Sequence, residues 1–170
     1  LTAIKKDADM VIKHLLDSLL YIQALPEGCG TVADIGSGAG FPGIQVKIMR
    51  PDIKVYLVEP SGKKAAFLKH VSRRLRLEDI QVVEKRIEST QIREDIPEPV
   101  DVALTRALFD IGTFVKKVSH IVRKGGICIV NKGPRVQEEI ELIGNMRFKM
   151  LTLPLPLTKI KRHIVIVSIP

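Results

Sequence analysis

A short segment near residue 35 places three glycines at alternate positions, directly after an apolar run that ends in an acid. Asp34 is the acid near the end of that run, and Gly36, Gly38 and Gly40 follow it. Glycine has no Cβ atom, so the backbone can take positive φ and approach a ligand closely. The next segment, residues 44–49, has a helical pattern, and free N–H groups at a helix start can hold an anionic group. The segment predicts a strand–loop–helix unit that binds a small nucleoside-bearing cofactor.

Two cofactor patterns overlap in this loop. Gly38-x-Gly40-x-x-Gly43 satisfies the dinucleotide fingerprint, which alone is weak evidence. Asp34-x-Gly36-x-Gly38-x-Gly40 satisfies the D-x-G-x-G-x-G pattern of methyltransferases that use S-adenosylmethionine (SAM). SAM carries an α-amino acid instead of a pyrophosphate, so its ammonium group needs a carboxylate, and Asp34 is placed for that contact. A tight turn without a ligand is the alternative interpretation.

The composition indicates one globular domain. The chain has 170 residues, of which 45% are hydrophobic and 27% charged, which is ordinary for a soluble protein with a real core. No stretch is as long as a membrane span, and Leu1 begins no recognisable signal peptide. Cys29 and Cys128 lie far apart and form no metal-type pair. We expect a cytoplasmic, monomeric protein with no bound metal and no membrane contact.

Strand-like and helix-like segments alternate along most of the chain. This alternation predicts a parallel sheet with helices on both faces, and its strands are expected at 31–35, 54–58, 80–84, 100–105 and 127–131. Ser61 is expected to cap the helix after the second strand. A further helix is expected at 111–122, ended by Gly125-Gly126, and residues 92–99 read as an irregular loop.

The last two strand-like segments, 148–153 and 163–169, are joined by a short link that contains proline. No crossover helix fits there, so they should form an antiparallel pair. The predicted fold class is therefore α/β: a Rossmann-like SAM-dependent methyltransferase fold with a mostly parallel seven-stranded sheet that ends in an antiparallel hairpin. A domain that binds a nicotinamide cofactor would continue with another strand–helix unit and a catalytic domain, and these would need more residues. We expect a single methyltransferase domain over 1–170, with 1–28 as a helical cover, which includes a helix at 8–25, and 29–170 as the catalytic core.

Ligands of an open α/β sheet lie beyond the carboxyl ends of its strands. Glu59 follows the second strand, where its carboxylate can accept both ribose hydroxyls; the alternative is a solvated acid. Ile87 and Glu88 follow the third strand and would flank the adenine. Phe41 can wall the pocket beside the methionine part of SAM, and Arg106 follows the fourth strand.

The net charge of +8 favours a polyanionic partner. Lys69, Arg73 and Arg76 have helical spacing and should share one face, opposite an apolar side made of Phe67, Leu68, Val71 and Leu75. A second basic cluster near the end contains Lys159, Lys161, Arg162 and His163. RNA contact is the interpretation we favour, and a solvated surface is the alternative for any single residue.

Motifs typical of other methyltransferase classes are missing, and their absence narrows the kinds of atom that this protein could methylate. The segment after the fourth strand is Leu104-Thr105-Arg106-Ala107, which lacks the D/N-P-P-Y/F motif of amino-group methyltransferases. Methylation of cytosine C5 needs a nucleophilic cysteine in a Pro-Cys loop, whereas Cys128 sits inside a strand. No catalytic base is apparent. Guanine N7 already presents an in-plane lone pair, so its methylation needs positioning without deprotonation.

Several motifs together resemble the RsmG (GidB) family of bacterial 16S rRNA guanine-N7 methyltransferases. The resemblance rests on Lys13-His14-Leu15-Leu16-Asp17-Ser18-Leu19 and on Asp34–Gly43, and extends over nearly the whole chain through three shorter segments, Leu104–Ala107, Asn131-Lys132-Gly133 and Arg162-His163. The chain departs from the family pattern at Ile87, where alanine is usual, and at Val58-Glu59-Pro60, where V-D-S is usual.

The resemblance implies methylation of N7 of one guanine near the decoding site of 16S rRNA, with SAM as donor and S-adenosylhomocysteine as product. It implies SAM contacts at Gly36, Phe41, Ile87, Glu88 and Arg106, with Glu59 at the ribose. Arg106 is the candidate catalytic residue, although it could instead touch RNA phosphate or form a structural salt bridge. The expected partner is 16S rRNA or the small ribosomal subunit, contacted by Lys69, Arg73, Arg76, Lys132 and Arg162. The alternatives are a methyltransferase for another substrate and a non-catalytic RNA-binding protein in ribosome assembly.

Overall fold

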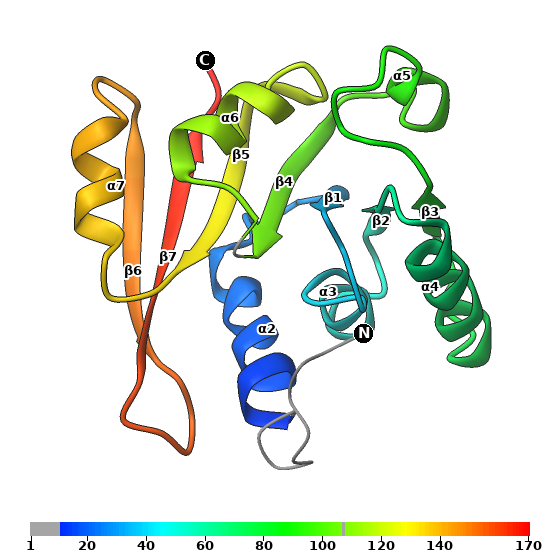
Figure 1. Cartoon of the computed structure of the whole chain (residues 1–170), viewed down its shortest axis with the longest axis horizontal. Helices are drawn as coiled ribbons and strands as arrows, with labels where there is room; N and C mark the ends of the chain where they lie inside the picture. The colour runs from blue at the N-terminus through cyan, green and yellow to red at the C-terminus, as the bar shows by residue number, and fades with distance from the viewer. Residues whose placement is uncertain (1–10, 107) are drawn as a thin grey trace.

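The computed structural model describes residues 11–106 and 108–170, which form a single seven-stranded sheet in the order β3-β2-β1-β4-β5-β7-β6 (Figure 1). Five strands, β1 to β5, run parallel, and β7 pairs antiparallel with both β5 and β6. The predicted fold class is therefore confirmed, including the closing hairpin. The strands are β1 (Thr31–Ile35), β2 (Lys54–Val58), β3 (Ile80–Val83), β4 (Val100–Arg106), β5 (Val122–Lys132), β6 (Phe148–Pro154) and β7 (Lys161–Ser168).

Successive residues of a strand point to opposite faces of the sheet, and in the central strands both sets are apolar. Helices therefore cover both faces. One face packs against the N-terminal helical segment, α3 and α4, and the other packs against α5, α6 and α7. The N-terminal segment is η1 (Val11–Leu16), α2 (Asp17–Leu19) and η2 (Leu20–Ala24). The other helices are α3 (Gly43–Met49), α4 (Gly62–Arg74), α5 (Ile92–Asp95), α6 (Ile111–Val118) and α7 (Val136–Leu142).

The sheet reverses its direction of winding between β1 and β4. The chain builds outward through β2 and β3, then returns to place β4 on the other side of β1. Loops after β1 and β4 consequently lead to opposite faces, and open α/β sheets bind ligands at such a switch point. The glycine loop follows β1 and Arg106 ends β4, so both predicted site segments lie at this switch point.

The glycine pair at 125–126 is inside a strand, so the expectation that it ends a helix is wrong. Helix α6 stops at Val118, and β5 already begins at Val122. The register with β4 jumps from Val122 to Ile127, so the glycines lie in a bulge. A Cβ atom at Gly126 would lie 2.8 Å from the carbonyl oxygen of Asp101, which explains why a residue without a side chain is needed.

Three smaller expectations also differ from the structure. The expected loop at 92–99 contains the short helix α5. Ser61 occupies the N-cap position of α4 but its side chain accepts no capping hydrogen bond; its N–H instead donates to Glu59. The N-terminal helix is confirmed from residue 11 onward as three consecutive helical pieces, and residues 8–10 lie outside the described residues.

The amino edge of the sheet is held together by one carboxylate. Asp101 accepts hydrogen bonds from the N–H groups of Gly30 and Thr31 at 2.8 and 2.9 Å, and Arg123 Nε donates to its other oxygen at 2.6 Å. The carboxylate thereby joins the start of β1 to β4 and β5. Its position is at the opposite end of the strands from the glycine loop.

We predict that Asp101→Asn lowers the free energy of unfolding by about 1–2 kcal/mol, because the amide keeps the contacts to β1 and loses the charge that holds Arg123. Urea unfolding measures the change. Ligand affinity at the opposite edge should stay as in the wild type. Unchanged stability would contradict the role assigned to this carboxylate.

Candidate functional site

The register of the sheet brings residues from four segments into one row at its carboxyl edge. Asp34 aligns with Leu104 in β4, so Gly36 follows at the level of Arg106. Arg106 in turn aligns with Asn131 of β5, and Asn131 aligns with Ile164 of β7. The glycine loop and the ends of β4 and β5 are therefore neighbours, although almost one hundred residues separate the first from the last.

Backbone hydrogen bonds hold the glycine loop in place. Gly36, Gly38 and Gly40 all have positive φ, at 75°, 58° and 92°. The N–H groups of Gly36 and Ser37 donate to the Val58 carbonyl, and Gly40 N–H donates to the Ser37 carbonyl. The loop is consequently tied to the end of β2 and does not rest on side-chain packing alone.

The expected free N–H groups at the start of α3 are already used. Gly43 N–H donates to Asp34 Oδ2 at 2.9 Å, and Ile44 N–H donates to the Gly40 carbonyl. The expectation that these groups hold an anionic part of the cofactor is therefore wrong for these two positions.

The four loop glycines serve different purposes. A Cβ atom at Gly40 would lie 2.4 Å from Ile44 Cδ1, and at Gly43 it would lie 2.4 Å from Leu57 Cδ2, so these two allow close packing within the protein. At Gly36 it would meet the side chain of Leu108, which follows β4. At Gly38 its only neighbour within 4 Å is the Gly36 carbonyl oxygen, at 3.8 Å. Gly38 is thus the glycine whose missing side chain leaves open space beside the loop.

Asp34 is fully buried under the start of α3. Its Oδ2 accepts the Gly43 N–H, whereas its Oδ1 has no hydrogen-bond partner within residues 11–106 and 108–170. Burial raises the pKa of this carboxyl to about 7, although the hydrogen bond from Gly43 lowers it. A buried carboxylate oxygen without a donor is costly, so this atom suits a cationic ligand group.

Glu59, directly after β2, anchors the loop. Its Oε2 accepts the Gly38 N–H at 2.9 Å and its Oε1 accepts the Ser61 N–H at 2.9 Å. Lys64 Nζ lies 4.0 Å from Oε2. The carboxylate is almost completely buried, and each oxygen retains a second lone pair for a hydroxyl donor.

Phe41 lies against two polar side chains that also contact each other. The His14 ring lies 4.9 Å from the Phe41 ring and nearly parallel to it, and the Arg106 guanidinium carbon lies 5.5 Å from the Phe41 centroid. Arg106 Nη2 also donates to His14 Nδ1 at 2.7 Å. Burial and the Arg106 charge both lower the pKa of His14. Because a guanidinium group can only donate, His14 Nδ1 is the acceptor in this contact.

Asp17 connects the N-terminal segment to the same edge. Its carboxylate accepts hydrogen bonds from Arg162 Nε at 2.8 Å and from Asn131 Nδ2 at 3.2 Å, and its Oδ2 lies 4.0 Å from Arg106 Nη1. We call these four residues the Asp17 cluster. They come from α2, β4, β5 and β7, and so join the N-terminal segment to three strands at the carboxyl edge.

The two residues expected at the adenine have different environments. Ile87 is buried in the core on the α6 side of the sheet. Glu88 forms an ion pair with Lys117 of α6, which lowers the pKa of the Glu88 carboxyl. Glu88 also lines a surface cavity of about 470 Å³ between α5 and α6. No contact between these residues and the glycine loop is among their hydrogen bonds or ion pairs in the described part of the chain.

The predicted basic stripe is only partly formed. Lys69 and Arg73 lie on α4, but the helix ends at Arg74, and Arg76 lies beyond it with φ of 52°, so the three do not share one face. Leu68 is buried as expected, whereas Leu75 is exposed, contrary to the expected packing. Lys69 pairs with Glu84 at 3.3 Å.

Lys132 is held within the protein. Its Nζ donates to the Phe109 carbonyl and lies 2.8 Å from Glu139 Oε2, and its side chain is only 10% exposed. Arg162, the fifth predicted RNA-binding residue, belongs to the Asp17 cluster.

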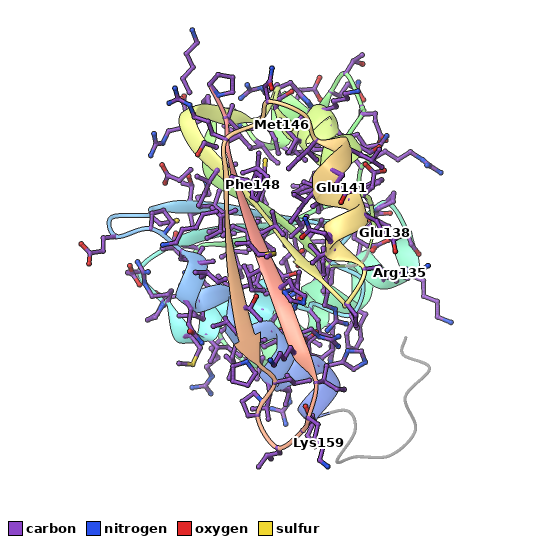
Figure 2. The ribbon with its side chains drawn as sticks, turned by 90° about the vertical axis from the view of Figure 1, so that its left-hand side faces the viewer. Arg135, Glu138, Glu141, Met146, Phe148 and Lys159 are labelled. Atoms are coloured by element: carbon purple, nitrogen blue, oxygen red, sulfur yellow. The ribbon has the colours of Figure 1, made fainter. Side chains whose placement is uncertain are left out.

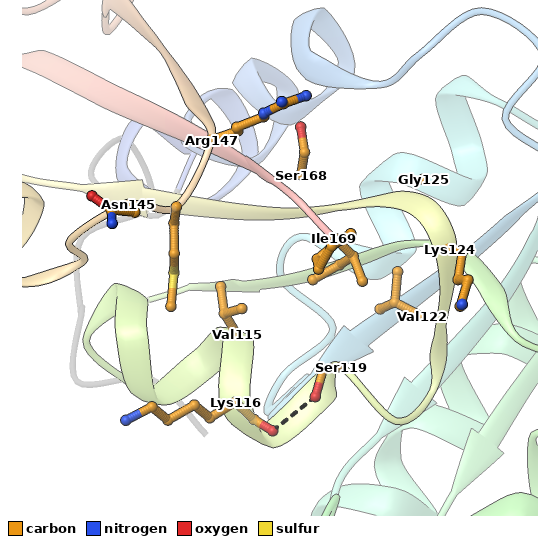
Figure 3. A pocket seen from close by; sticks show the side chains of 12 residues that line it. Val115, Lys116, Ser119, Val122, Lys124, Gly125, Asn145, Arg147, Ser168 and Ile169 are labelled. Atoms are coloured by element: carbon orange, nitrogen blue, oxygen red, sulfur yellow. Dashed lines mark hydrogen bonds between the residues drawn. The ribbon is translucent and has the colours of Figure 1, made fainter.

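A large cavity lies away from this site. It has a volume of about 1240 Å³ and lies between α6, β5 and the chain that follows β7. Apolar side chains such as Val115, Val122 and Ile169 line it together with polar ones such as Lys116 and Arg147 (Figure 3). It shares no residue with the glycine loop. Cys128 is fully buried, and burial raises the pKa of its thiol to about 12, which agrees with a core role. Among the described residues there is no His, Cys, Asp or Glu group suited to a metal ion, and no helix there is long and apolar enough to cross a membrane.

The sequence patterns identified the glycine loop, Glu59 and Arg106 but missed four residues around them. His14 and Asp17 contact Arg106, Asn131 donates to Asp17, and Leu108 lies over Gly36. The motif that contains His14 and Asp17 was the available signal. Its helical pattern indicated only a cover for the core.

We predict that Asp34→Asn removes a pH dependence of stability. The folded wild type holds the Asp34 proton up to about pH 7, whereas the unfolded chain releases it near pH 4. The unfolded state therefore binds fewer protons in this window, and stability falls as the pH rises through it, by at most about 4 kcal/mol. Urea unfolding from pH 4.5 to 8 measures the difference between the variant and the wild type. Parallel curves would show that Asp34 is ionised in the folded protein.

Solved structures with the same fold are methyltransferases. A SAM-dependent methyltransferase from Aquifex aeolicus matches with a TM-score of 0.68 and 19% identity, covering 96% of this chain and 94% of the other. An rRNA methylase from Streptococcus thermophilus matches with a TM-score of 0.59 and 15% identity, covering 98% of each chain. At these identities the likeness shows the fold alone.

Proteins that are similar in sequence identify the family more specifically than the solved structures do. The chain is 37% identical over 166 residues to a ribosomal RNA small subunit methyltransferase G from Methylobacillus flagellatus, covering 97% of this chain and 78% of the relative. It is 36% identical to the protein of the same name from Alkaliphilus metalliredigens, covering 99% and 74%. The family model of GidB, described as rRNA small subunit methyltransferase G, matches residues 1–164. The chain therefore belongs to the GidB family.

Proposed function

We propose that this chain is a SAM-dependent methyltransferase that modifies N7 of one guanine in 16S rRNA. The observation that supports this most is the open space beside Gly38, between buried carboxylates at Asp34 and Glu59 and at the switch point of the sheet. Membership of the GidB family supports the RNA substrate. The proposal treats residues 1–170 as one domain whose N-terminal segment, 1–28, covers the core.

The residues present fit SAM. The Asp34 carboxyl has a buried oxygen without a donor among the described residues, and the ammonium group of SAM can supply one. Glu59 has acceptor capacity left for the ribose hydroxyls while its two backbone contacts hold the loop. Gly36, Gly38 and Gly40 form the floor, Phe41 is a wall beside the methionine part, and Ile87 and Glu88 are assigned to the adenine side. SAM supplies an electrophilic methyl group and leaves as S-adenosylhomocysteine.

The chain contributes position and shielding to the transfer. Arg106 belongs to the Asp17 cluster and also faces Phe41 of the glycine loop, where it can orient the target guanine or its phosphate. Leu108 and Phe41 place apolar surface beside the loop and exclude water from it. Guanine N7 already carries an available lone pair, so the residues need not remove a proton, and proximity accounts for most of the rate.

The basic charge fits an RNA partner, because contacts to phosphates carry most of the affinity for nucleic acid. The proposal assigns the reaction to the cytoplasm and to a monomer that acts on the small ribosomal subunit or on naked 16S rRNA. It involves neither a metal nor a membrane.

The test is transfer of labelled methyl groups from SAM to small-subunit particles and, separately, to naked 16S rRNA, followed by mapping of the modified base. A single N7-methylguanine supports the proposal. A label on another base or on protein contradicts the assigned substrate, and SAM binding without transfer to either form of RNA contradicts catalysis.

We predict that Gly38→Val lowers SAM affinity at least tenfold, because the valine side chain would fill the space beside the loop. Calorimetric titration measures the affinity. Gly28→Val is the matched control, since Gly28 also has positive φ, at 73°, and open surroundings, but precedes β1 at the other edge of the sheet. The two variants carry similar backbone strain. Equal SAM affinity in both variants would contradict the assignment of the loop.

We predict that Lys69→Glu combined with Arg73→Glu lowers rRNA affinity and reduces the magnitude of the salt slope by about 1–2, as expected for the loss of phosphate contacts. SAM affinity should stay unchanged. Arg50→Glu with Lys54→Glu makes the same charge change around the start of β2 and serves as the control. If both double variants bind rRNA equally well, α4 does not contact the RNA.

A further inference from the structure

The Asp17 cluster contains two cations and one anion in a confined space. The Asp17 side chain is 5% exposed, and those of Arg106 and Arg162 are 21% and 24% exposed. A carboxylate buried to this extent is stable only when charged donors compensate it, and here two guanidinium groups and an amide do so. The same carboxylate keeps the two positive groups near each other, where they would otherwise repel.

Asp17 contacts only one edge of the Arg162 guanidinium. The hydrogen bond comes from Nε and uses neither of the two Nη groups. Within residues 11–106 and 108–170, neither Nη group of Arg162 donates a hydrogen bond. Two N–H groups on one fixed plane match the geometry of a phosphate group.

The hairpin brings Arg162 to the same edge of the sheet as the glycine loop, with β4 and β5 between them. β7 runs antiparallel to β5, so its first residues lie at the carboxyl edge of the parallel strands, where Lys132 aligns with His163. The turn between β6 and β7 extends past that edge on the same side as α2 (Figure 1), and Lys159 lies in this turn (Figure 2). A strand of RNA that follows the hairpin toward the glycine loop must pass the Asp17 cluster.

We propose that Asp17 is a positioning residue for RNA binding. It fixes Arg162 through Nε and holds Arg106 beside it, so that the two guanidinium groups bind one phosphate of the RNA backbone next to the nucleotide to be methylated. This inference rests on the proposed function. It assigns a specific task to a residue of the N-terminal segment, which would otherwise only cover the core.

The structure provides a matched control at the other edge of the sheet. Asp101 is also a shielded carboxylate that accepts backbone N–H groups and pairs with an arginine, Arg123, through Nε at 2.6 Å. Asp17→Asn and Asp101→Asn therefore make the same chemical change in a similar setting. Only the first affects cations at the edge where the glycine loop lies.

The experiment compares these two variants with the wild type in full-length chains. For Asp17→Asn we expect rRNA affinity to fall about tenfold or more, with a salt slope smaller in magnitude by about 1, while SAM affinity stays within twofold. In methyl transfer the loss should appear in KM for RNA more than in kcat. Asp101→Asn should change stability without changing KM or the salt slope.

A second variant guards against loss of folding in Asp17→Asn. Arg162→Lys keeps the charge on a partly exposed side chain but removes the Nε donor and the planar pair of Nη groups. It should reproduce the loss of rRNA affinity. Adding Asp17→Asn to Arg162→Lys should then cost less than the single Asp17→Asn change costs in the wild type.

The outcomes separate this inference from the proposed function. If the wild type neither binds nor methylates rRNA, the proposed function fails and this inference fails with it. If the wild type is active but Asp17→Asn or Arg162→Lys keeps wild-type KM and salt slope, only the positioning role is overturned. Equal losses in Asp17→Asn and Asp101→Asn would reduce Asp17 to a structural residue.

Discussion

Buried carboxylates hold the carboxyl edge of this sheet in place. Glu59 fixes the loop backbone at Gly38, Asp34 receives the first N–H of α3, and Asp17 ties two arginines to the ends of β5 and β7. Each acid is almost fully buried and accepts at least one hydrogen bond from another segment. The geometry of the site is therefore set by the need to satisfy these charges as well as by hydrophobic packing.

Much of the fold could be predicted because the strands obey simple periodicity. The bounds of β1 and β2 are as expected, and the missing crossover helix correctly indicated the antiparallel hairpin. Errors arose where one residue type serves two structural purposes. The glycines at 125–126 allow a bulge in which the Asp101 carbonyl approaches closely, yet in sequence they look like a helix stop. Helical spacing likewise continued to Arg76, although the chain turns away after Arg74.

The site was less predictable than the fold because many of its contacts join residues that are far apart in the sequence. Alternating glycines after an acid are a local signal, and they indicated the loop, Asp34 and Glu59 correctly as neighbours. The contact between Asp17 and Arg162 joins residues 145 positions apart, and nothing in the local pattern of either residue indicates the other. Likewise, only the folded chain shows that Lys132 is engaged by Glu139, whereas Gly38 borders open space.

The raised pKa of Asp34 has a thermodynamic consequence for any cationic ligand. A positive group placed against its donor-free oxygen favours the ionised carboxyl and lowers the pKa from about 7. Complex formation at neutral pH would then expel a proton to the buffer, so the apparent enthalpy would vary with the ionisation heat of that buffer. Acidification would also weaken the complex, even though the ligand keeps its own charge.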